Sequence, residues 1–156
     1  MDDQPPRFGV GPAISAVVLV WAGAMGAVHV IWYPTFAVTG PLRIGFAVAG
    51  IVLGIVGVVL YGWGLRVFNR ARRADRLATT GPYARCRHPI YGTWIFLVGP
   101  GICLLTGSWL LLTTSVVAYV AARLLVGREE RTMAARYGEA WRAYRARTGR
   151  FVPRWV

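Results

Sequence analysis

The feature that most constrains this chain is a long stretch, from Pro89 to Ala122, that contains no charged side chain. A helix of roughly 20 residues crosses a hydrocarbon core about 30 Å thick, so this stretch is too long for one comfortable crossing. The sequence "TGS" at Thr106–Ser108 offers a turn in its middle, and "GPG" at Gly99–Gly101 offers a kink because proline removes a helical hydrogen bond. The stretch is therefore predicted to form a helical hairpin that crosses a membrane twice.

Two further apolar stretches predict two further membrane spans. One covers Ala13–Tyr33, and the other covers Ile44–Leu65 between Arg43 and Arg66. The chain of 156 residues is 56% hydrophobic, which is too apolar for an ordinary soluble domain. The predicted fold class is all-α: a polytopic integral membrane bundle of about four transmembrane helices, followed by a cytoplasmic C-terminal amphipathic helix.

The basic residues predict how the bundle sits in its membrane. The net charge is +12, and all 18 basic residues are arginine, which suggests a bacterial genome rich in G and C. They cluster between the second and third spans and after the fourth, whereas the opposite side has only Arg43. The positive-inside rule then predicts that both termini and the long loop between the second and third spans lie in the cytoplasm, with the first span retained rather than cleaved as a signal peptide. Anionic membrane lipids explain such clusters better than nucleic acid does, so membrane lipids are an expected partner and nucleic acid is not.

Small residues and cysteines have structural interpretations. Gly50 and Gly54 form a GxxxG spacing in the second span with Gly57 close by, and small residues let helix backbones approach closely. Packing within the bundle is favoured over a dedicated dimer interface, and the oligomeric state stays open. Cys86 and Cys103 match no disulfide or metal spacing, so free thiols and no metal site are expected.

The segment after the fourth span combines charge with aromatic side chains. If it forms an unbroken helix from Arg123 onward, at about 100° per residue, several of its residues fall on one narrow stripe. These are Arg123, Glu130, Tyr137, Trp141 and Tyr144. A helix on a membrane surface favours an apolar stripe instead. Periodicity alone leaves both interpretations open, and Gly127 and Gly138 could break the helix.

Two motif-bearing segments resemble a known family. "GPYARCRHPIYG" (81–92), followed by "REERTMAARYGEAWRAYRARTGRFVP" (128–153), resembles the isoprenylcysteine carboxyl methyltransferase family. The wider group includes phospholipid N-methyltransferases and small prokaryotic integral membrane methyltransferases. The shared elements are G-x-Y, R-H-P-x-Y-x-G, a double glutamate, Y-G-x-x-W-x-x-Y and R-x-x-P. The resemblance implies a single domain over residues 1–156, in which residues 1–76 are scaffold and residues 77–156 form the cofactor-binding and catalytic half.

The resemblance also implies a cofactor, S-adenosyl-L-methionine, and a lipophilic methyl acceptor. The residues implied for catalysis are Arg87, Arg123 and Glu130. Those implied for cofactor binding are Tyr83, His88, Pro89, Tyr91, Glu129, Glu130, Tyr137, Trp141 and Tyr144. Aromatic faces attract a sulfonium, carboxylates suit a ribose or an amino group, and a guanidinium suits the donor's carboxylate. Arg87, His88, Arg123 and Glu130 are therefore expected to line one cavity, with Tyr91 and Tyr137 as its walls.

Other functions stay open on the sequence. A membrane reductase of the sterol-reductase type, which uses NADPH, shares the R-H-P and Y-G-x-x-W patterns, and a non-catalytic scaffold could keep the fold. The acceptor is equally open between an isoprenylcysteine-like carboxylate, a phospholipid amine and a small hydrophobic molecule. A carboxylate acceptor needs no general base, whereas for an amine or thiol the candidates are Glu130 and His88.

Overall fold

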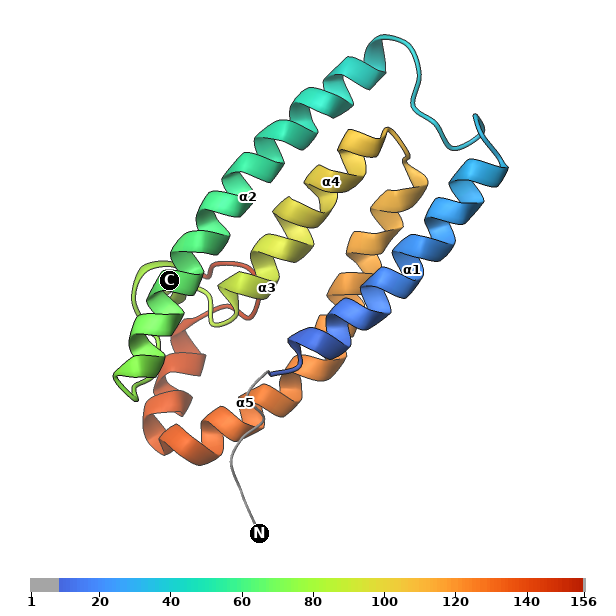
Figure 1. The fold of residues 1–156 in the computed structure, drawn as a ribbon. Coiled ribbons are helices and arrows are strands. Elements are labelled where there is room, and N and C mark those ends of the chain that lie inside the picture. Colours follow the sequence, from blue (N-terminus) through green and yellow to red (C-terminus); the bar gives the residue numbers. More distant parts are fainter. Residues whose placement is uncertain (1–8, 156) are drawn as a thin grey trace.

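The computed structural model describes residues 9–155, and within them the regular elements are all helical. The elements are α1 (Gly11–Ile31), α2 (Pro41–Arg73), a 3₁₀ turn (Gly81–Ala84), α3 (Pro89–Thr93), a π turn (Trp94–Val98), α4 (Gly99–Thr106), a second 3₁₀ turn (Leu110–Leu112) and α5 (Thr113–Arg147). Figure 1 shows α1, α2, α4 and the first part of α5 running side by side as a bundle. The all-α prediction is confirmed.

Four helical stretches of the described chain are long and apolar enough to cross a membrane. They are Gly11–Ile31, Pro41–Arg73, Pro89–Thr106 and Leu110–Arg147. Large apolar side chains such as Val20, Ile44 and Leu124 are exposed on the outside of the bundle, as lipid contact requires. The chain is therefore a multi-pass membrane protein, with the predicted number of spans.

The predicted hairpin is confirmed in detail. The π turn directly precedes "GPG", so the helix widens where Pro100 cannot donate a backbone hydrogen bond. Gly107, at φ 73°, then ends α4 in the left-handed conformation that glycine adopts readily. The chain reverses here and re-enters the bundle as α5.

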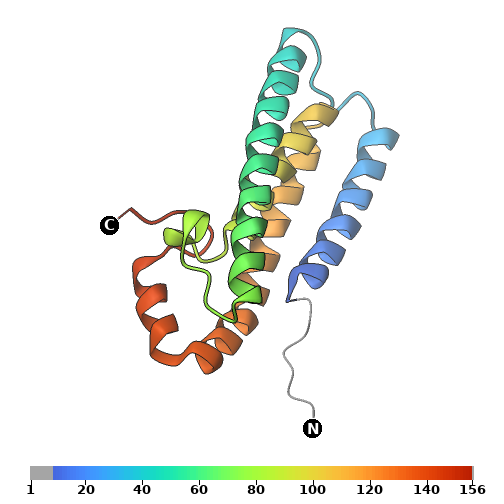
Figure 2. The ribbon, with the colours of Figure 1, turned by 60° about the vertical axis from the view of Figure 1, so that its left-hand side comes forward.

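The last helix is much longer than a membrane span. Leu110–Arg147 has 38 residues, about 57 Å of helix, against a hydrocarbon core of about 30 Å. Its apolar part, up to Val126, forms the fourth span, and its charged part leaves the bundle and curves beneath the end of α2 (Figures 1 and 2). The assumption of an unbroken helix is wrong at Gly138, where φ 51° and ψ −122° interrupt the helical backbone. The predicted C-terminal helix is thus a continuation of the fourth span that bends at a glycine.

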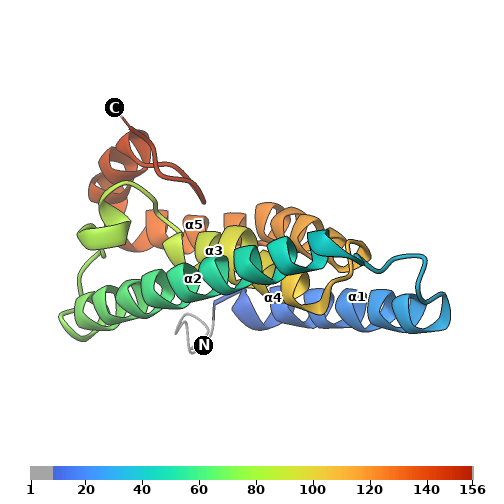
Figure 3. The same ribbon diagram turned by 90° about the horizontal axis from the view of Figure 1, so that it is seen from above.

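The spans pack as two pairs, and the membrane core lies between them. α4 packs on α2, and α5 packs on α1 (Figure 3). The buried apolar cluster near the charged end of the bundle joins residues from α1, the π turn, α5 and the C-terminal segment: Ile14, Ile95, Ala121, Ala122, Val126 and Phe151. This cluster fixes the C-terminal segment against the membrane bundle.

A stripe of small residues lets α4 approach α2 closely. The buried residues of α2 are Gly50, Gly57, Gly64 and Ala71, each seven positions from the next. A Cβ added at Gly50 would lie 2.8 Å from the Gly101 carbonyl oxygen, and one added at Gly57 would lie 2.7 Å from Val98 Cγ2. Gly50 and Gly57 therefore serve packing within the bundle, as expected, whereas a Cβ at Gly54 would meet nothing within 4 Å.

This stripe gives a first testable expectation. Gly50→Ala should destabilise the protein by about 1–2 kcal/mol, because the new methyl group meets a backbone carbonyl that cannot move aside cheaply. Gly54→Ala is the matched control on the same helix, since a Cβ there meets nothing within 4 Å. Thermal unfolding in detergent measures both variants. An equal effect of the two substitutions would contradict the packing described.

Candidate functional site

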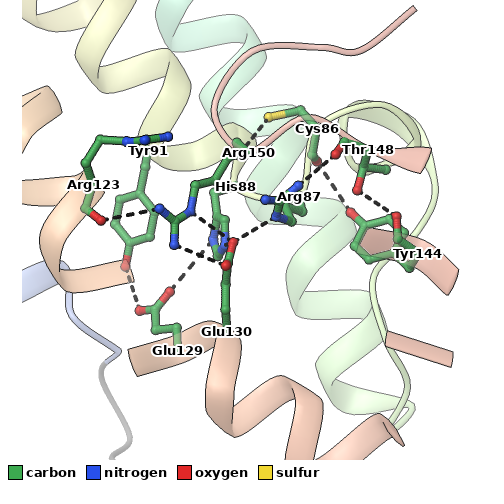
Figure 4. Close-up of polar contacts among 10 residues, drawn as sticks. All are labelled: Cys86, Arg87, His88, Tyr91, Arg123, Glu129, Glu130, Tyr144, Thr148 and Arg150. Atoms are coloured by element: carbon green, nitrogen blue, oxygen red, sulfur yellow. Dashed lines mark hydrogen bonds and ion pairs between the residues drawn. The ribbon is translucent and has the colours of Figure 1, made fainter. Parts of the chain in front are cut away.

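Two segments far apart in the sequence pair at the charged end of the bundle. Cys86 and Gly149 form an isolated parallel bridge. The Arg87 N–H donates to the Gly149 carbonyl at 2.9 Å, and the His88 N–H donates to the Arg150 carbonyl at 3.0 Å. This pairing holds the side chains of Arg87 and His88 against that of Arg150 (Figure 4).

Glu130 lies at the centre of a cluster of cationic and hydrogen-bonding groups. Arg87 Nε donates to its Oε1 at 2.8 Å, and His88 Nε2 lies 3.3 Å from the same oxygen. Arg150 binds both carboxylate oxygens, with Nε to Oε1 and Nη2 to Oε2 each at 3.1 Å. Glu130 is only 6% exposed, so this charge is held almost entirely by protein groups.

These partners decide the ionisation of Glu130. The residue lies beyond the membrane-spanning part of α5, on the charged continuation of the helix. Burial by itself would raise the pKa of this carboxyl, but hydrogen bonds from His88, Arg150 and Arg87 outweigh burial and hold its pKa well below the usual range. Glu130 is therefore a permanent anion, which suits it to hold cations rather than to exchange protons near neutral pH.

The neighbouring carboxylate, Glu129, joins three elements. Its Oε1 accepts a hydrogen bond from Tyr91 Oη at 2.8 Å and one from the Val10 N–H at 2.6 Å. Its Oε2 lies 3.9 Å from His88 Nδ1. Glu129 thus ties the start of α1 to α3 and α5, and its side chain keeps 20% of its surface exposed, more than that of Glu130.

The aromatic residues near the site mainly hold the loop that carries Arg87 and His88. Tyr144 Oη donates to the Tyr83 carbonyl at 2.7 Å, and the ring of Trp141 lies 5.8 Å from that of Tyr144. Burial raises the pKa of the Cys86 thiol in this loop to about 11, although a backbone hydrogen bond from His88 and the charge of Arg87 act in the opposite direction. This thiol is neutral and structural.

The structure brings most of the expected site residues together. Arg87, His88, Tyr91, Glu129 and Glu130 are linked by pairwise contacts into one network (Figure 4). The fixed charges of Arg87 and Arg150 balance those of Glu129 and Glu130. Pro89 is buried at the first turn of α3, where its missing N–H costs little.

Tyr83, Trp141 and Tyr144 support the loop beside this cluster, whereas Arg123 and Tyr137 belong to neither the cluster nor the loop support. The Arg123 side chain is exposed, and only its backbone carbonyl takes part, accepting a bond from Arg150 Nη1 at 3.3 Å. Tyr137 is half-buried and stacks with Arg136 at 5.5 Å. Arg123 was expected to line one cavity with Glu130, but the arginines that contact this carboxylate are Arg87 and Arg150.

Sequence reasoning missed two residues of this cluster. Arg150 makes three side-chain hydrogen bonds to Glu130 and Arg123, and the Thr148 carbonyl accepts a bond from Arg87 Nη1 at 2.7 Å. Both residues lie in the C-terminal segment. The signal was present in the R-x-x-P element, whose arginine is Arg150.

The polar side chains of the cluster suit a cofactor that carries both an amino-acid group and a nucleoside. Glu129 and Glu130 suit amino or ribose hydroxyl groups, and Arg87, with 12% of its side chain exposed, suits a carboxylate. The buried Trp141 Nε1 has no hydrogen-bond partner among the described residues, so a donor is available beside the loop. No group of three or more His, Cys, Asp or Glu side chains in residues 9–155 is placed to hold a metal ion.

Comparison with known proteins gives a family and two relatives. The family model described as phospholipid methyltransferase matches residues 42–140. The nickel-cobalt-cadmium resistance protein NccN of Alcaligenes xylosoxydans xylosoxydans is 30% identical over 95% of this chain and 65% of its own length. The cobalt-zinc-cadmium resistance protein CzcN of Cupriavidus metallidurans is 30% identical over 99% of this chain and 68% of its own length. The chain thus spans about two thirds of each relative, and no solved structure matches it.

Proposed function

The chain belongs to the phospholipid methyltransferase family, and on that premise we propose that it transfers a methyl group from S-adenosyl-L-methionine to a lipophilic acceptor in the membrane. The observation that carries the proposal is the cluster of Arg87, His88 and Glu130 with Glu129 and Tyr91 at the end of the membrane bundle. Members of this family generally use this cofactor. The positive-inside pattern supports a bacterial inner membrane location, with the cluster and both termini on the cytoplasmic side.

In this proposal different residues of the cluster bind different groups of the cofactor. Glu129, the more exposed carboxylate, binds the amino or ribose groups, and Arg87 binds the carboxylate. Glu130 and Arg150 keep Arg87 in place, and the ring of Tyr91, which is hydrogen-bonded to Glu129, attracts the positive sulfonium. When bound, the cofactor supplies an electrophilic methyl group. The protein contributes alignment and exclusion of water, because methyl transfer is an in-line displacement.

The proposed methyl acceptor is a molecule that dissolves in the bilayer. The cluster continues directly from membrane-spanning helices, so an acceptor dissolved in the bilayer reaches it without leaving the membrane. A carboxylate acceptor needs no base. For an amine or thiol acceptor, His88 is the better placed base, because the partners of Glu130 keep that carboxylate ionised and fully hydrogen-bonded.

A ligand-binding measurement tests the cofactor. S-adenosylmethionine at a hundred times its dissociation constant should stabilise the purified protein by about 2.7 kcal/mol, seen as a rise in melting temperature in detergent. NADPH at the same concentration should have no effect. A shift with NADPH and none with S-adenosylmethionine would support the reductase instead.

A transfer assay tests the reaction. Incubating the protein with methyl-labelled S-adenosylmethionine and bacterial lipid extract should label a product that partitions into organic solvent. Mass spectrometry of that product distinguishes an ester, a methylated amine and a thioether. Arg87→Ala is the matched inactive control. If the protein bound the cofactor but methylated nothing in lipid extracts from several sources, a non-catalytic membrane scaffold would describe it better.

A further inference from the structure

A second polar site lies on the loop that leads to the cluster, at the end of α2. The chain forms a cleft of about 90 Å³ there. It is lined by Val67, Arg70, Ala71, Arg76, Leu77, Ala78, Thr79 and Thr80. None of these residues takes part in the Glu130 cluster, so this cleft needs its own explanation.

The charge of the cleft is positive and uncompensated. Arg70 and Arg76 line it, and no acidic side chain does. Asp75 is the neighbouring acid in the chain, and it pairs with Arg136 of α5. Within residues 9–155 neither Arg70 nor Arg76 forms an ion pair, so both guanidinium groups are available to an anion.

Two hydroxyl groups complete the lining. Thr79 is half-buried and Thr80 is exposed, and neither hydroxyl forms a hydrogen bond with another described residue. Two guanidinium groups, which can only donate, and two hydroxyls, which can donate, surround a small volume and are groups of the kind that bind a phosphate.

The depth of the cleft points to a lipid phosphate. α2 has 33 residues, about 50 Å of helix, against a hydrocarbon core of about 30 Å. Its apolar part ends at Leu65, so Arg70 and the loop after the helix lie past the hydrocarbon, at the level of the headgroups. The phosphate groups of phospholipids are the most abundant anions at that depth.

The helix end itself does not oppose an anion here. A helix C-terminus carries a partial negative charge on its unpaired carbonyl groups. At the end of α2 the carbonyls of Arg70, Ala71 and Arg72 are occupied, because they accept hydrogen bonds from the N–H groups of the three residues that follow the helix. Arg70, Arg72 and Arg73 of the same turn outweigh the remaining dipole.

We propose that this cleft binds the phosphate of an anionic membrane phospholipid, with Arg70 and Arg76 as its principal ligands. The proposal does not depend on methyl transfer, since the lipid need not be the acceptor. The cleft lies on the loop that continues through Tyr83 to His88, so a bound lipid would fix that loop at the membrane surface.

Native mass spectrometry of the detergent-solubilised protein tests this, with dioleoylphosphatidylglycerol as the probe. Arg70→Gln with Arg76→Gln should weaken its binding at least about tenfold, the usual effect of losing a charge-assisted hydrogen bond. Arg72→Gln with Arg73→Gln is the matched control, because it removes the same charge from the same helix end outside the cleft. That pair should change binding less than about threefold, as expected for general surface attraction.

The outcomes separate the alternatives. Equal losses in the two double variants would show diffuse attraction to anionic lipid and overturn the proposal. If inorganic phosphate bound the cleft as tightly as the lipid does, the cleft would be a site for free anions, and the proposal would be overturned. Dioleoylglycerol, which has the same chains and no phosphate, should not bind measurably. If it bound like the phospholipid, the chains rather than the phosphate would be recognised.

Discussion

Glu130→Ala is expected to destabilise the protein by about 3–5 kcal/mol and to remove measurable binding of S-adenosylmethionine. The substitution leaves Arg87 and Arg150, whose side chains are only 12% and 21% exposed, without their shared anion. The loss extends beyond cofactor affinity to the fold, because Glu130 also joins α5 to the C-terminal segment.

A conservative substitution at Glu130 separates the effect of losing the charge from the effect of losing the side-chain volume. Glu130→Gln keeps the volume of the side chain and part of its hydrogen bonding, so it should fold and lower cofactor affinity roughly ten- to a hundredfold. Glu139→Gln is the control, since Glu139 is exposed and pairs only with Arg142 on the helix surface. Unfolding in detergent and calorimetric titration measure the two effects. If both Glu130 variants matched the parent protein in stability and in cofactor affinity, the cluster would not be the cofactor site.

The pH dependence of stability follows from the same carboxylate. The folded-state pKa of Glu130 lies below its ordinary value of 4.5, so its contribution to stability is present in full above that value. It is lost as the pH falls through the lowered folded-state pKa. The stability difference between the parent and Glu130→Gln should therefore stay constant from about pH 6 to 8 and shrink under strongly acidic conditions.

Gly92→Ala is expected to destabilise the protein by about 3 kcal/mol and to impair the site at the same time. A Cβ at Gly92 would collide with the Phe151 carbonyl oxygen, which belongs to the segment that positions Arg150. That segment would have to move, and Arg150 would withdraw from Glu130. This explains why the R-H-P-x-Y-x-G element of the loop ends in glycine.

The control for Gly92 lies on another helix. Gly26→Ala in α1 meets nothing within 4 Å, so it should change stability by less than about 1 kcal/mol, in the favourable direction set by helix propensity. Thermal unfolding, with and without S-adenosylmethionine, measures both variants. If Gly92→Ala had the same melting temperature as Gly26→Ala and still bound the cofactor, the close contact with Phe151 would not contribute to stability or to the site.

The membrane architecture was readable from the sequence because hydrocarbon thickness imposes one simple length on every span. The uncharged stretch from Pro89 to Ala122 predicted a hairpin, and its turn lies at Gly107 as expected. The break at Gly138 was less predictable. Glycine permits both the helical and the left-handed conformation, and tertiary packing chooses between them.

The cluster was predicted only in part, for a similar reason. Motifs identified Arg87, His88, Glu129 and Glu130, which lie on two segments joined by the hairpin. Arg150 was missed because its position depends on backbone pairing between Cys86 and Gly149, and no periodicity reports such pairing. A helical wheel describes one helix, so it could not show that an arginine of another segment binds Glu130 while the Arg123 side chain is exposed.

The continuity of α5 also sets a relation between the protein and the thickness of its bilayer. Glu130 lies seventeen residues after Thr113, about 26 Å along one helix, and no hinge separates the two before Gly138. The helix therefore acts as a fixed spacer that presents the carboxylates near one edge of a hydrocarbon layer about 30 Å thick. A thicker bilayer would draw these charges toward lipid tails, and a thinner one would lift them into water. The thickness of the host membrane thus sets the depth at which these carboxylates lie.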